Sequence, residues 1–349
     1  MHFASDNWAG AHPKIAANLN RHSDGFASAY GTSTLDRAID ETFNTIFERE
    51  VAVFFVGTGT AANSLAQAAI GRPGGVTFAH REAHLIEDEG GAPGFLSAGG
   101  RFQPVDGPTG RIDTNNLKIA IRGFAPGNVH AGQPMGVSIT QSTEIGTIYE
   151  LGEISAISAL CKDNSLPLHM DGARFANALI TLGCSPADMT WKQGVDILSF
   201  GGTKNGCWCA EALIFMNPDQ AKDVPFIRKR SAQLFSKSRF VAAQFEAYFA
   251  GGLWLELATH ANTMARFLAE QIAGSKKMRL AWQPQANEVF AIASKSVVAS
   301  LQASGAIFYE WKPPHNEENL LANDETMIRL VTSFATTQEE VRQFGDLIA

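Results

Sequence analysis

The sequence predicts an α/β fold, and three observations carry that prediction. Continuous apolar runs, typical of buried strands, alternate with helix-like segments through the first two thirds of the chain. Glycine-rich or polar residues follow several of these runs, as they do where strands pass into helices. After about Pro225 the pattern changes to a long helical segment followed by shorter elements. We therefore expect an N-terminal arm and a large domain with a mostly parallel central sheet over residues 1–240, and a smaller α/β domain over residues 241–349.

The first unit of the large domain is expected to be a helix, a strand and a second helix. Residues 34–49 repeat apolar side chains at helical spacing. Residues 51–56 read VAVFFV, a continuous apolar run that is typical of a buried parallel strand. Residues 57–60 break this run with glycine and threonine, and the alanine-rich residues 61–70 are expected to be helical.

The same alternation continues along the chain. In the large domain we expect a helix at 150–163 and strands at 75–79, 134–139, 166–170, 195–200 and 212–215. In the C-terminal part we expect helical structure over 226–273, broken near Gly251-Gly252, and strands at 288–292 and 327–331.

Composition and charge exclude several classes of protein. The 349 residues carry 28 Lys and Arg against 35 Asp and Glu, a net charge of −7 that offers no basic surface for nucleic acid or an anionic membrane. No run of eighteen apolar residues occurs, and the first residues do not resemble a signal peptide. The four cysteines fit neither a disulfide framework nor a zinc pattern, so we expect reduced thiols, a cytoplasmic protein and no metal site.

A glycine- and threonine-rich turn joins the strand at 51–56 to the next helix. It reads Gly57-Thr58-Gly59-Thr60. Free N–H groups and the helix dipole at such a helix start favour a phosphate, and glycines let the backbone approach it. Taken alone, a turn of this kind is more often an ordinary connection between a strand and a helix.

Two further segments place reactive side chains after strands. Asp171, in His169-Met170-Asp171-Gly172, lies where parallel sheets bind ligands, although an aspartate there also caps helices. Lys204 lies among glycines after the strand at 195–200, and in isolation it would be read as a surface lysine. A phosphate-binding turn, an aspartate and then a lysine are together the parts that pyridoxal phosphate (PLP) requires. The aspartate pairs with the pyridine nitrogen, and the lysine amine forms a Schiff base.

The sequence resembles the threonine aldolases, in the β-eliminating-lyase branch of fold-type I PLP enzymes. The resemblance runs through essentially the whole chain, and its most specific part is the block from His169 to Arg174 followed by a glycine-flanked lysine. The other matching segments are Ser5-Asp6, Tyr30-Gly31, Thr58-Gly59-Thr60 with Asn63, His84, Glu89-Gly90, Thr203-Lys204 and Ile328-Arg329-Leu330-Val331-Thr332.

The resemblance implies a role for each matching residue. Lys204 would hold PLP covalently, Asp171 would pair with the pyridine nitrogen, and Thr58, Gly59 and Thr60 would bind the phosphate. The resemblance thus implies that these residues bind the cofactor and that Lys204 and Asp171 are also catalytic.

The remaining implied roles concern the substrate. His84 would stack on the cofactor ring near the substrate hydroxyl, so it counts as both catalytic and cofactor-binding. Ser5, Arg174 and Arg329 would grip the substrate carboxylate, a task that suits the planar fork of arginine, and Arg174 is also expected to bind the cofactor. The implied activity is cleavage of L-threonine or L-allo-threonine to glycine and an aldehyde.

One departure from the family pattern bears on specificity. Many members carry Asn-Thr-His-Asn where this chain reads Gln141-Ser142-Thr143-Glu144, so that Thr143 replaces a second histidine near the substrate hydroxyl. Threonine is shorter and no base near neutral pH. We therefore expect low specificity, with both diastereomers accepted, L-allo-threonine preferred and phenylserine admitted.

The resemblance also implies an assembly. The family suggests a homotetramer, a dimer of dimers, with active sites shared between subunits. A helix with Arg230, Lys237 and Arg239 could supply a phosphate contact to a neighbour, and the sequence does not choose among the three.

Two other functions remain open at this point. A β-eliminating lyase on the same scaffold would remove the α-proton of cysteine, tryptophan or tyrosine. A non-enzymatic α/β nucleotide-binding protein would form no covalent adduct and would be colourless.

Overall fold

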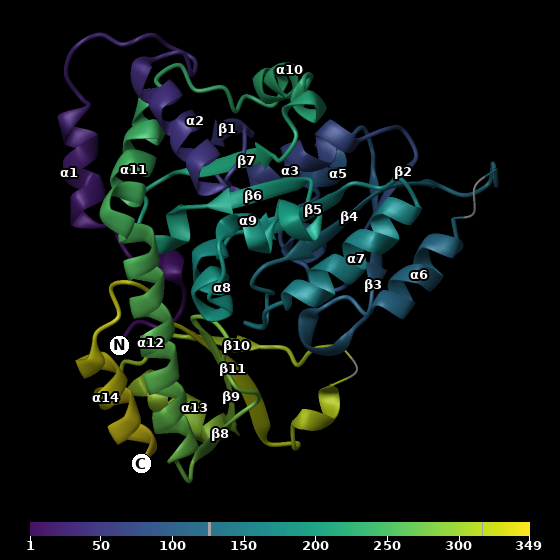
Figure 1. Ribbon diagram of the computed structural model, residues 1–349. Coiled ribbons are helices and arrows are strands. Elements are labelled where there is room, and N and C mark those ends of the chain that lie inside the picture. Colours follow the sequence, from purple (N-terminus) through teal and green to yellow (C-terminus); the bar gives the residue numbers. More distant parts are fainter. Residues whose placement is uncertain (125–126, 316) are drawn as a thin grey trace.

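The computed structural model describes residues 1–124, 127–315 and 317–349, and it contains two sheets (Figure 1). The large sheet has seven strands in the order β1-β7-β6-β5-β4-β2-β3, and the small sheet has four in the order β10-β11-β9-β8. Strands β2 to β6 pair in parallel, whereas β7 is antiparallel to both of its neighbours. The predicted α/β fold, with a mostly parallel large sheet and a smaller C-terminal unit, is confirmed.

The bounds of the elements follow in chain order. The strands are β1 (Ala52–Val56), β2 (Gly75–His80), β3 (Arg101–Val105), β4 (Gln133–Thr140), β5 (Leu168–Gly172), β6 (Ile197–Gly201), β7 (Glu211–Phe215), β8 (Met278–Leu280), β9 (Glu288–Ser294), β10 (Tyr309–Trp311) and β11 (Glu325–Val331). The α-helices are α1 (Pro13–Arg21), α2 (Thr34–Ile46), α3 (Gly59–Ile70), α4 (His84–Glu87), α5 (Ala92–Leu96), α6 (Thr114–Arg122), α7 (Leu151–Asp163), α8 (Phe175–Leu182), α9 (Pro186–Met189), α10 (Val224–Arg230), α11 (Arg239–Phe249), α12 (Leu253–Ala273), α13 (Lys295–Ala303) and α14 (Gln338–Ile348).

The apolar run at 51–56 forms a strand, but the prediction that it is parallel is wrong. Strand β1 pairs antiparallel with β7 at the edge of the large sheet. The run is apolar because both faces are covered: Phe55 packs into one core cluster and Val56 into another. Burial on two faces, rather than strand direction, explains the sequence pattern.

The helical segment at 226–273 is broken in two places. The predicted break at Gly251-Gly252 is confirmed, and both glycines adopt the left-handed conformation, with φ of 62° and 76°. A second break, between α10 and α11, was not predicted, because residues 231–238 contain no proline or glycine to mark it.

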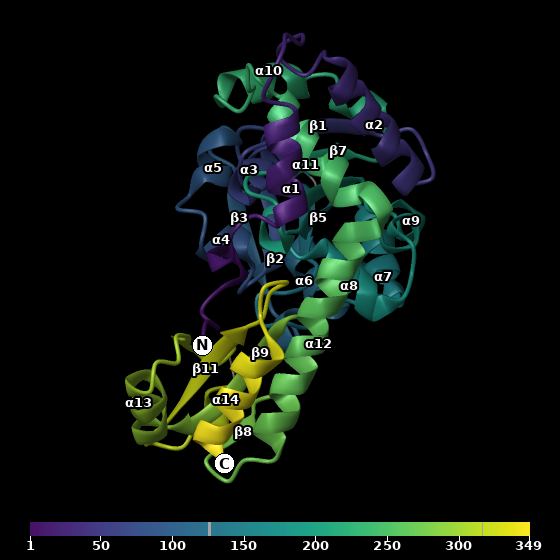
Figure 2. The ribbon, with the colours of Figure 1, turned by 90° about the vertical axis from the view of Figure 1, so that its left-hand side faces the viewer.

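Packing joins the two sheets through α12, which extends from the large sheet to the small one (Figure 1). Leu257 near its start belongs to the core of the large sheet, and Leu268 near its end belongs to the core of the small sheet. The N-terminus lies beside the small sheet (Figure 2), where Phe3 is fully buried. Helix α11 packs on the core of the large sheet. The division into two domains at residues 240 and 241 remains a prediction.

The described part of the chain contains no helix long and apolar enough to cross a membrane. The carboxyl ends of β5 and β6 lie side by side, because the two strands are parallel neighbours. Asp171 and the segment leading to Lys204 are therefore brought to the same edge of the sheet.

Candidate active site

Six of the predicted site residues line one cavity of about 250 Å³ at this edge of the large sheet. They are Thr58, Gly59, Thr60, His84, Asp171 and Lys204. The cavity is also lined by residues that were not placed in the site from the sequence, namely Asn7, Gly57, Asn63, Glu89, Glu144, Ala173, Thr203 and Glu211. Segments far apart in sequence thus form a single site.

The glycine- and threonine-rich turn forms the N-terminus of α3. Thr58 is the N-cap, and its hydroxyl oxygen accepts a hydrogen bond from the N–H of Ala61 at 3.0 Å. Gly59 and Thr60, in the first turn of the helix, come before the first intrahelical N–H donors. A Cβ atom placed on Gly59 would meet no atom within 4 Å, so the turn is open on this side. The helix start therefore offers an anion free N–H groups and the positive end of the helix dipole.

Asp171 is buried at the end of β5, and neutral groups hold its carboxylate. Asn63 Nδ2 donates to Asp171 Oδ2 at 2.7 Å, and the N–H of Ala173 donates to Oδ1 at 3.0 Å. These bonds orient the carboxylate without cancelling its charge. Asp171 can therefore pair with a cation inside the cavity.

Lys204 lies in a short 3-10 turn, Thr203–Asn205, that follows β6. The next residue anchors this turn, because Asn205 Nδ2 donates to the hydroxyl of Tyr248 and to the carbonyl of Trp254, both at 2.8 Å. Gly206 ends the turn with φ of 104°, and a Cβ there would lie 2.8 Å from Leu257. The lysine thus projects from a rigid segment toward the cavity.

His84 and Glu89, which also line the cavity, form a pair. His84 Nδ1 lies 3.0 Å from Glu89 Oε1, which also accepts a hydrogen bond from Asn63 at 2.7 Å. The hydrogen bond that His84 donates to Glu89 raises the pKa of His84, although burial opposes the change. Asn63 therefore links His84 and Glu89 to Asp171, and we call these four residues the cavity cluster.

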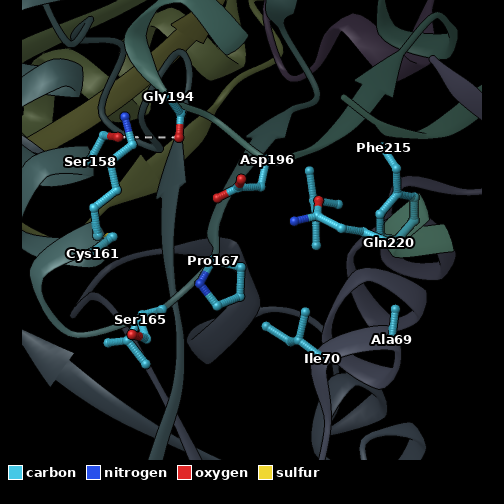
Figure 3. A pocket seen from close by; sticks show the side chains of 13 residues that line it. Ala69, Ile70, Ser158, Cys161, Ser165, Pro167, Gly194, Asp196, Phe215 and Gln220 are labelled. Atoms are coloured by element: carbon cyan, nitrogen blue, oxygen red, sulfur yellow. Dashed lines mark hydrogen bonds between the residues drawn. The ribbon is translucent and has the colours of Figure 1, made fainter. Parts of the chain in front are cut away.

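A larger hollow, of about 560 Å³, lies at the other end of the parallel strands (Figure 3). Figure 3 shows Asp196 and Phe215 at its wall, with Ser158 hydrogen-bonded to the carbonyl of Gly194. The amino ends of parallel strands are not where α/β sheets bind ligands. We therefore place the active site at the smaller cavity, where the reactive side chains meet.

Comparison with known proteins agrees with this geometry. Residues 2–296 match the model of the family described as beta-eliminating lyase. The chain belongs to the beta-eliminating lyase family.

Relatives of this lyase-family chain include threonine aldolases. It is 41% identical to the low specificity L-threonine aldolase of Pseudomonas aeruginosa over 308 residues, which is 88% of each chain. It is 24% identical to the enzyme of the same name from Escherichia coli, over 90% of this chain and 88% of that one. The threonine aldolase structure from Leishmania major superimposes with a TM-score of 0.91 at 28% identity, covering 99% of this chain and 98% of that one. The predicted resemblance to threonine aldolases is confirmed.

The three residues expected to grip the substrate carboxylate lie beside the cavity rather than on its wall. The hydroxyl of Ser5 accepts a hydrogen bond from the N–H of Asn7, and Asn7 is the residue that lines the cavity. Arg174 is buried, and Arg329 stacks on Trp311 with its guanidinium carbon 4.0 Å from the ring centre.

Two carboxylates hold these arginines. Asp6 accepts from Arg174 Nε at 2.8 Å and from Nη2 at 3.2 Å. Glu288, whose side chain is fully buried, lies 3.3 Å from Arg174 Nη1 and 3.8 Å from Arg329 Nη1. Burial raises the pKa of Asp6, but Arg174 and Lys204 outweigh that effect and leave the pKa below its usual value. We call Asp6, Arg174, Glu288 and Arg329 the arginine cluster.

Thr143, which was expected near the substrate hydroxyl, does not line the cavity. Thr143 is buried, its hydroxyl pairs with that of Thr147 at 2.7 Å, and it is absent from the residues that line the cavity. Its neighbour Glu144 lines the cavity and also an adjoining pocket of about 530 Å³, together with Trp311 and several acidic residues. Of these two adjacent residues, Glu144 is therefore the one that faces the cavity.

The expectation of one helix with three basic residues is also wrong. Arg230 ends α10, Arg239 begins α11, and Lys237 lies in the segment between them. Arg239 donates to the carbonyls of Asp24 and Gly25.

Several residues of the site escaped the sequence analysis for a common reason. Asp6, Asn63 and Glu89 were noted only through the resemblance, and Glu211 and Glu288 were not singled out in any role. A buried carboxylate looks like a surface one in sequence, unless it interrupts an apolar run. Glu211, at the head of an apolar strand, and Glu288, at the head of another, carry that signal.

The donor set of the cavity fits PLP. A helix start suits the phosphate, a buried carboxylate suits the pyridinium nitrogen, and a lysine amine suits the aldehyde. Glu89 Oε2 is buried without a hydrogen-bond partner among the described residues, so the cavity also has spare acceptor capacity. The residues that the structure describes contain no group of three or more His, Cys, Asp or Glu able to hold a metal ion.

Proposed function

We propose that this chain cleaves L-threonine and L-allo-threonine, and related β-hydroxy-α-amino acids such as phenylserine, to glycine and an aldehyde, with PLP held on Lys204. The observation that carries this proposal is the single cavity lined by the start of α3, Asp171 and Lys204. The names of the relatives, low specificity L-threonine aldolases, support the choice of substrate.

The cofactor would be held by this chain's own residues at three points. The N–H groups and hydroxyls of Thr58, Gly59 and Thr60 bind the phosphate, and Lys204 forms the covalent link. Asp171, oriented by Asn63, keeps the pyridine nitrogen protonated. When bound, PLP supplies an electron sink for the bond that breaks at Cα.

His84 is proposed to receive the proton of the substrate hydroxyl. Its Nδ1 is occupied by Glu89, which leaves Nε2 for the substrate. The raised pKa of His84 means that Glu89 stabilises the protonated ring, and this favours the proton transfer. We also propose that the ring of His84 lies against the face of the cofactor.

The arginine cluster is proposed to orient the amino acid. Arg329, which has a single distant carboxylate partner among the described residues, offers its guanidinium to the substrate carboxylate, with Arg174 and Ser5 beside it. Holding the carboxylate there would set the Cα–Cβ bond in the geometry for cleavage. Arg174 is further proposed to touch the cofactor.

We also propose a cytoplasmic homotetramer, a dimer of dimers whose subunits share active sites. Two exposed aromatic side chains near the site support an interface. Trp8, next to the cavity residue Asn7, is 55% exposed, and Trp208, between Lys204 and β7, is 67% exposed. We also propose that the chain divides into a large domain over residues 1–240 and a small domain over residues 241–349.

The test is incubation of the purified protein with each threonine diastereomer and assay of glycine and acetaldehyde. Borohydride treatment should leave a pyridoxyl group on Lys204, located by peptide mass. Labelling at Lys162 or Lys192 instead would overturn the assignment. Pyruvate and ammonia from serine or cysteine, without glycine from threonine, would identify a β-eliminating lyase, and a colourless protein would exclude both enzymes.

A further inference from the structure

Glu211 is a buried carboxyl group that the proposed mechanism does not use. It begins β7, is 6% exposed, and lines the cavity with the start of α3 and with Lys204. Its backbone pairs with Val56 on one side and with Gly201 on the other. Strand β1 leads from Val56 into the phosphate-binding turn, and β6 leads from Gly201 toward Lys204. Glu211 therefore lies between these two parts of the site.

One hydrogen bond fixes the side chain in this place. Glu211 Oε1 accepts from the N–H of Thr203 at 3.2 Å, and the hydroxyl of Thr203 in turn accepts from the N–H of Ala210 at 3.2 Å. Thr203 immediately precedes Lys204. The carboxyl group is thus tied to the lysine-bearing turn while it faces the cavity.

The surroundings of Glu211 hold little charge that could offset an anion. Lys204 and Asp171 act on it from the neighbouring strand ends, and the thiols of Cys207 and Cys209 lie nearby. The flanking strands β1 and β6 and the covering helix α3 carry no ionisable side chain. Asp219 follows the far end of β7 and is exposed.

A carboxylate at this position would repel a phosphate bound at the start of α3. Among the described residues that line the cavity, Lys204 and His84 are the basic ones, and Lys204 is taken up by the covalent link. Burial raises the pKa of Glu211 to about 7, against the hydrogen bonds from Thr203 and the charge of Lys204. A nearby phosphate dianion would raise that pKa further, since like charges disfavour ionisation.

We propose that Glu211 is a proton-carrying ligand of the cofactor phosphate, which it binds as the neutral acid and repels as the carboxylate. This inference rests on the proposed function, because it presumes PLP in this cavity. The neutral acid donates its O–H to a phosphate oxygen, whereas the carboxylate can only accept. Retention of the cofactor then falls as the pH rises through the pKa of Glu211.

The experiment is a titration of the cofactor-stripped protein with PLP at pH 6.5, 7.5 and 8.5, read by absorbance, for the parent and for Glu211→Gln. If only the neutral acid binds, the ratio of the parent Kd to the Glu211→Gln Kd rises by about twentyfold from pH 6.5 to pH 8.5. Because the parent Kd is divided by the variant Kd, the titration of Lys204 and of the phosphate itself cancels from this ratio. Glu82→Gln, in the adjoining pocket, is the matched control and should behave as the parent.

Pyridoxal, which lacks the phosphate, separates repulsion of the phosphate from damage to the lysine turn. With pyridoxal the same ratio should stay constant across the pH range. A flat ratio with PLP, or an equal rise with pyridoxal, would overturn the proposal. If Glu211→Gln does not fold, Glu211→Leu takes its place in the same ratio. Threonine cleavage is not read in this assay, so failure of the proposed function appears separately as normal PLP binding without glycine formation.

Discussion

The cavity cluster and the arginine cluster adjoin along the chain, at Asp171 and Arg174, yet they treat buried charge in opposite ways. In the cavity cluster, an asparagine and backbone N–H groups hold Asp171, so its charge stays available. In the arginine cluster, Asp6 and Glu288 compensate Arg174 within the protein. The first arrangement is prepared for a cationic ligand group. The second arrangement stabilises the fold, and Arg329 at its edge remains available to bind an anion.

The largest effect on activity is expected for a substitution of Asp171. Asp171→Asn should keep a hydrogen bond to Asn63. It should remove the negative charge that is proposed to pair with the pyridine nitrogen. Loss of one preorganised electrostatic group costs roughly 10²–10³ in kcat, so turnover should fall by about that factor while PLP remains bound. The measurement is kcat together with the absorbance of bound PLP. Turnover near that of the parent would refute the role of Asp171.

The arginine cluster should respond in stability instead. Arg174→Ala leaves Asp6 and Glu288 buried without their main partner, and breaking a buried ion pair typically costs about 3–5 kcal/mol. Urea unfolding of the variant, with the parent as reference, measures this loss. Asp171→Asn serves as the matched control, because it alters a buried carboxylate that no cation compensates. Equal stability of Arg174→Ala and the parent would contradict the compensation argued here.

Arg329 should separate binding from stability. Losing a charge-assisted hydrogen bond to the substrate carboxylate costs about 1.5–3 kcal/mol, or about one to two decades in affinity. Arg329→Ala should therefore raise the Kd for the amino acid while leaving the absorbance of bound PLP unchanged. Threonine bound as tightly by the variant as by the parent would remove Arg329 from the substrate site.

The smallest expected effect is a shift in pH dependence at Glu89. His84 acts as a base only when neutral, so activity should rise with pH as its raised pKa is passed. Glu89→Gln removes the carboxylate that raises this pKa, and the rising limb should move to lower pH. The pH profile of kcat/KM for both threonine diastereomers tests this, with His84→Phe as the variant that should impair cleavage more than cofactor binding. A limb that stays in place would show that another group titrates.

Prediction from sequence succeeded where the chain carries a local signal. The start of α3, the end of β5 and the lysine turn were each predicted from residues next to one another, and the structure brings all three to one cavity. It failed where the deciding contact is distant in sequence. Asp6 meets Arg174, and Glu288 meets both Arg174 and Arg329, although no spacing links these positions.

Thr143 and Glu144 show the same limit at the scale of one residue. The sequence places the segment near the site, but the direction of each side chain depends on how the backbone turns after β4. Thr143 is directed to Thr147, and Glu144 is directed to the cavity. A pattern that assigns a role to a position cannot decide between adjacent residues whose side chains have different surroundings.

The sequence by itself determined the alternation of strands and helices, the glycine- and threonine-rich turn, and the order of the aspartate and the lysine along the chain. Those features follow from local physics: apolar runs, helix starts and glycine-bearing turns are written in neighbouring residues. Only the tertiary structure decided which carboxylates are compensated and which stay available. That distinction depends on burial and on partners brought from other strands, because the free energy of a buried charge is set by the groups that surround it in space.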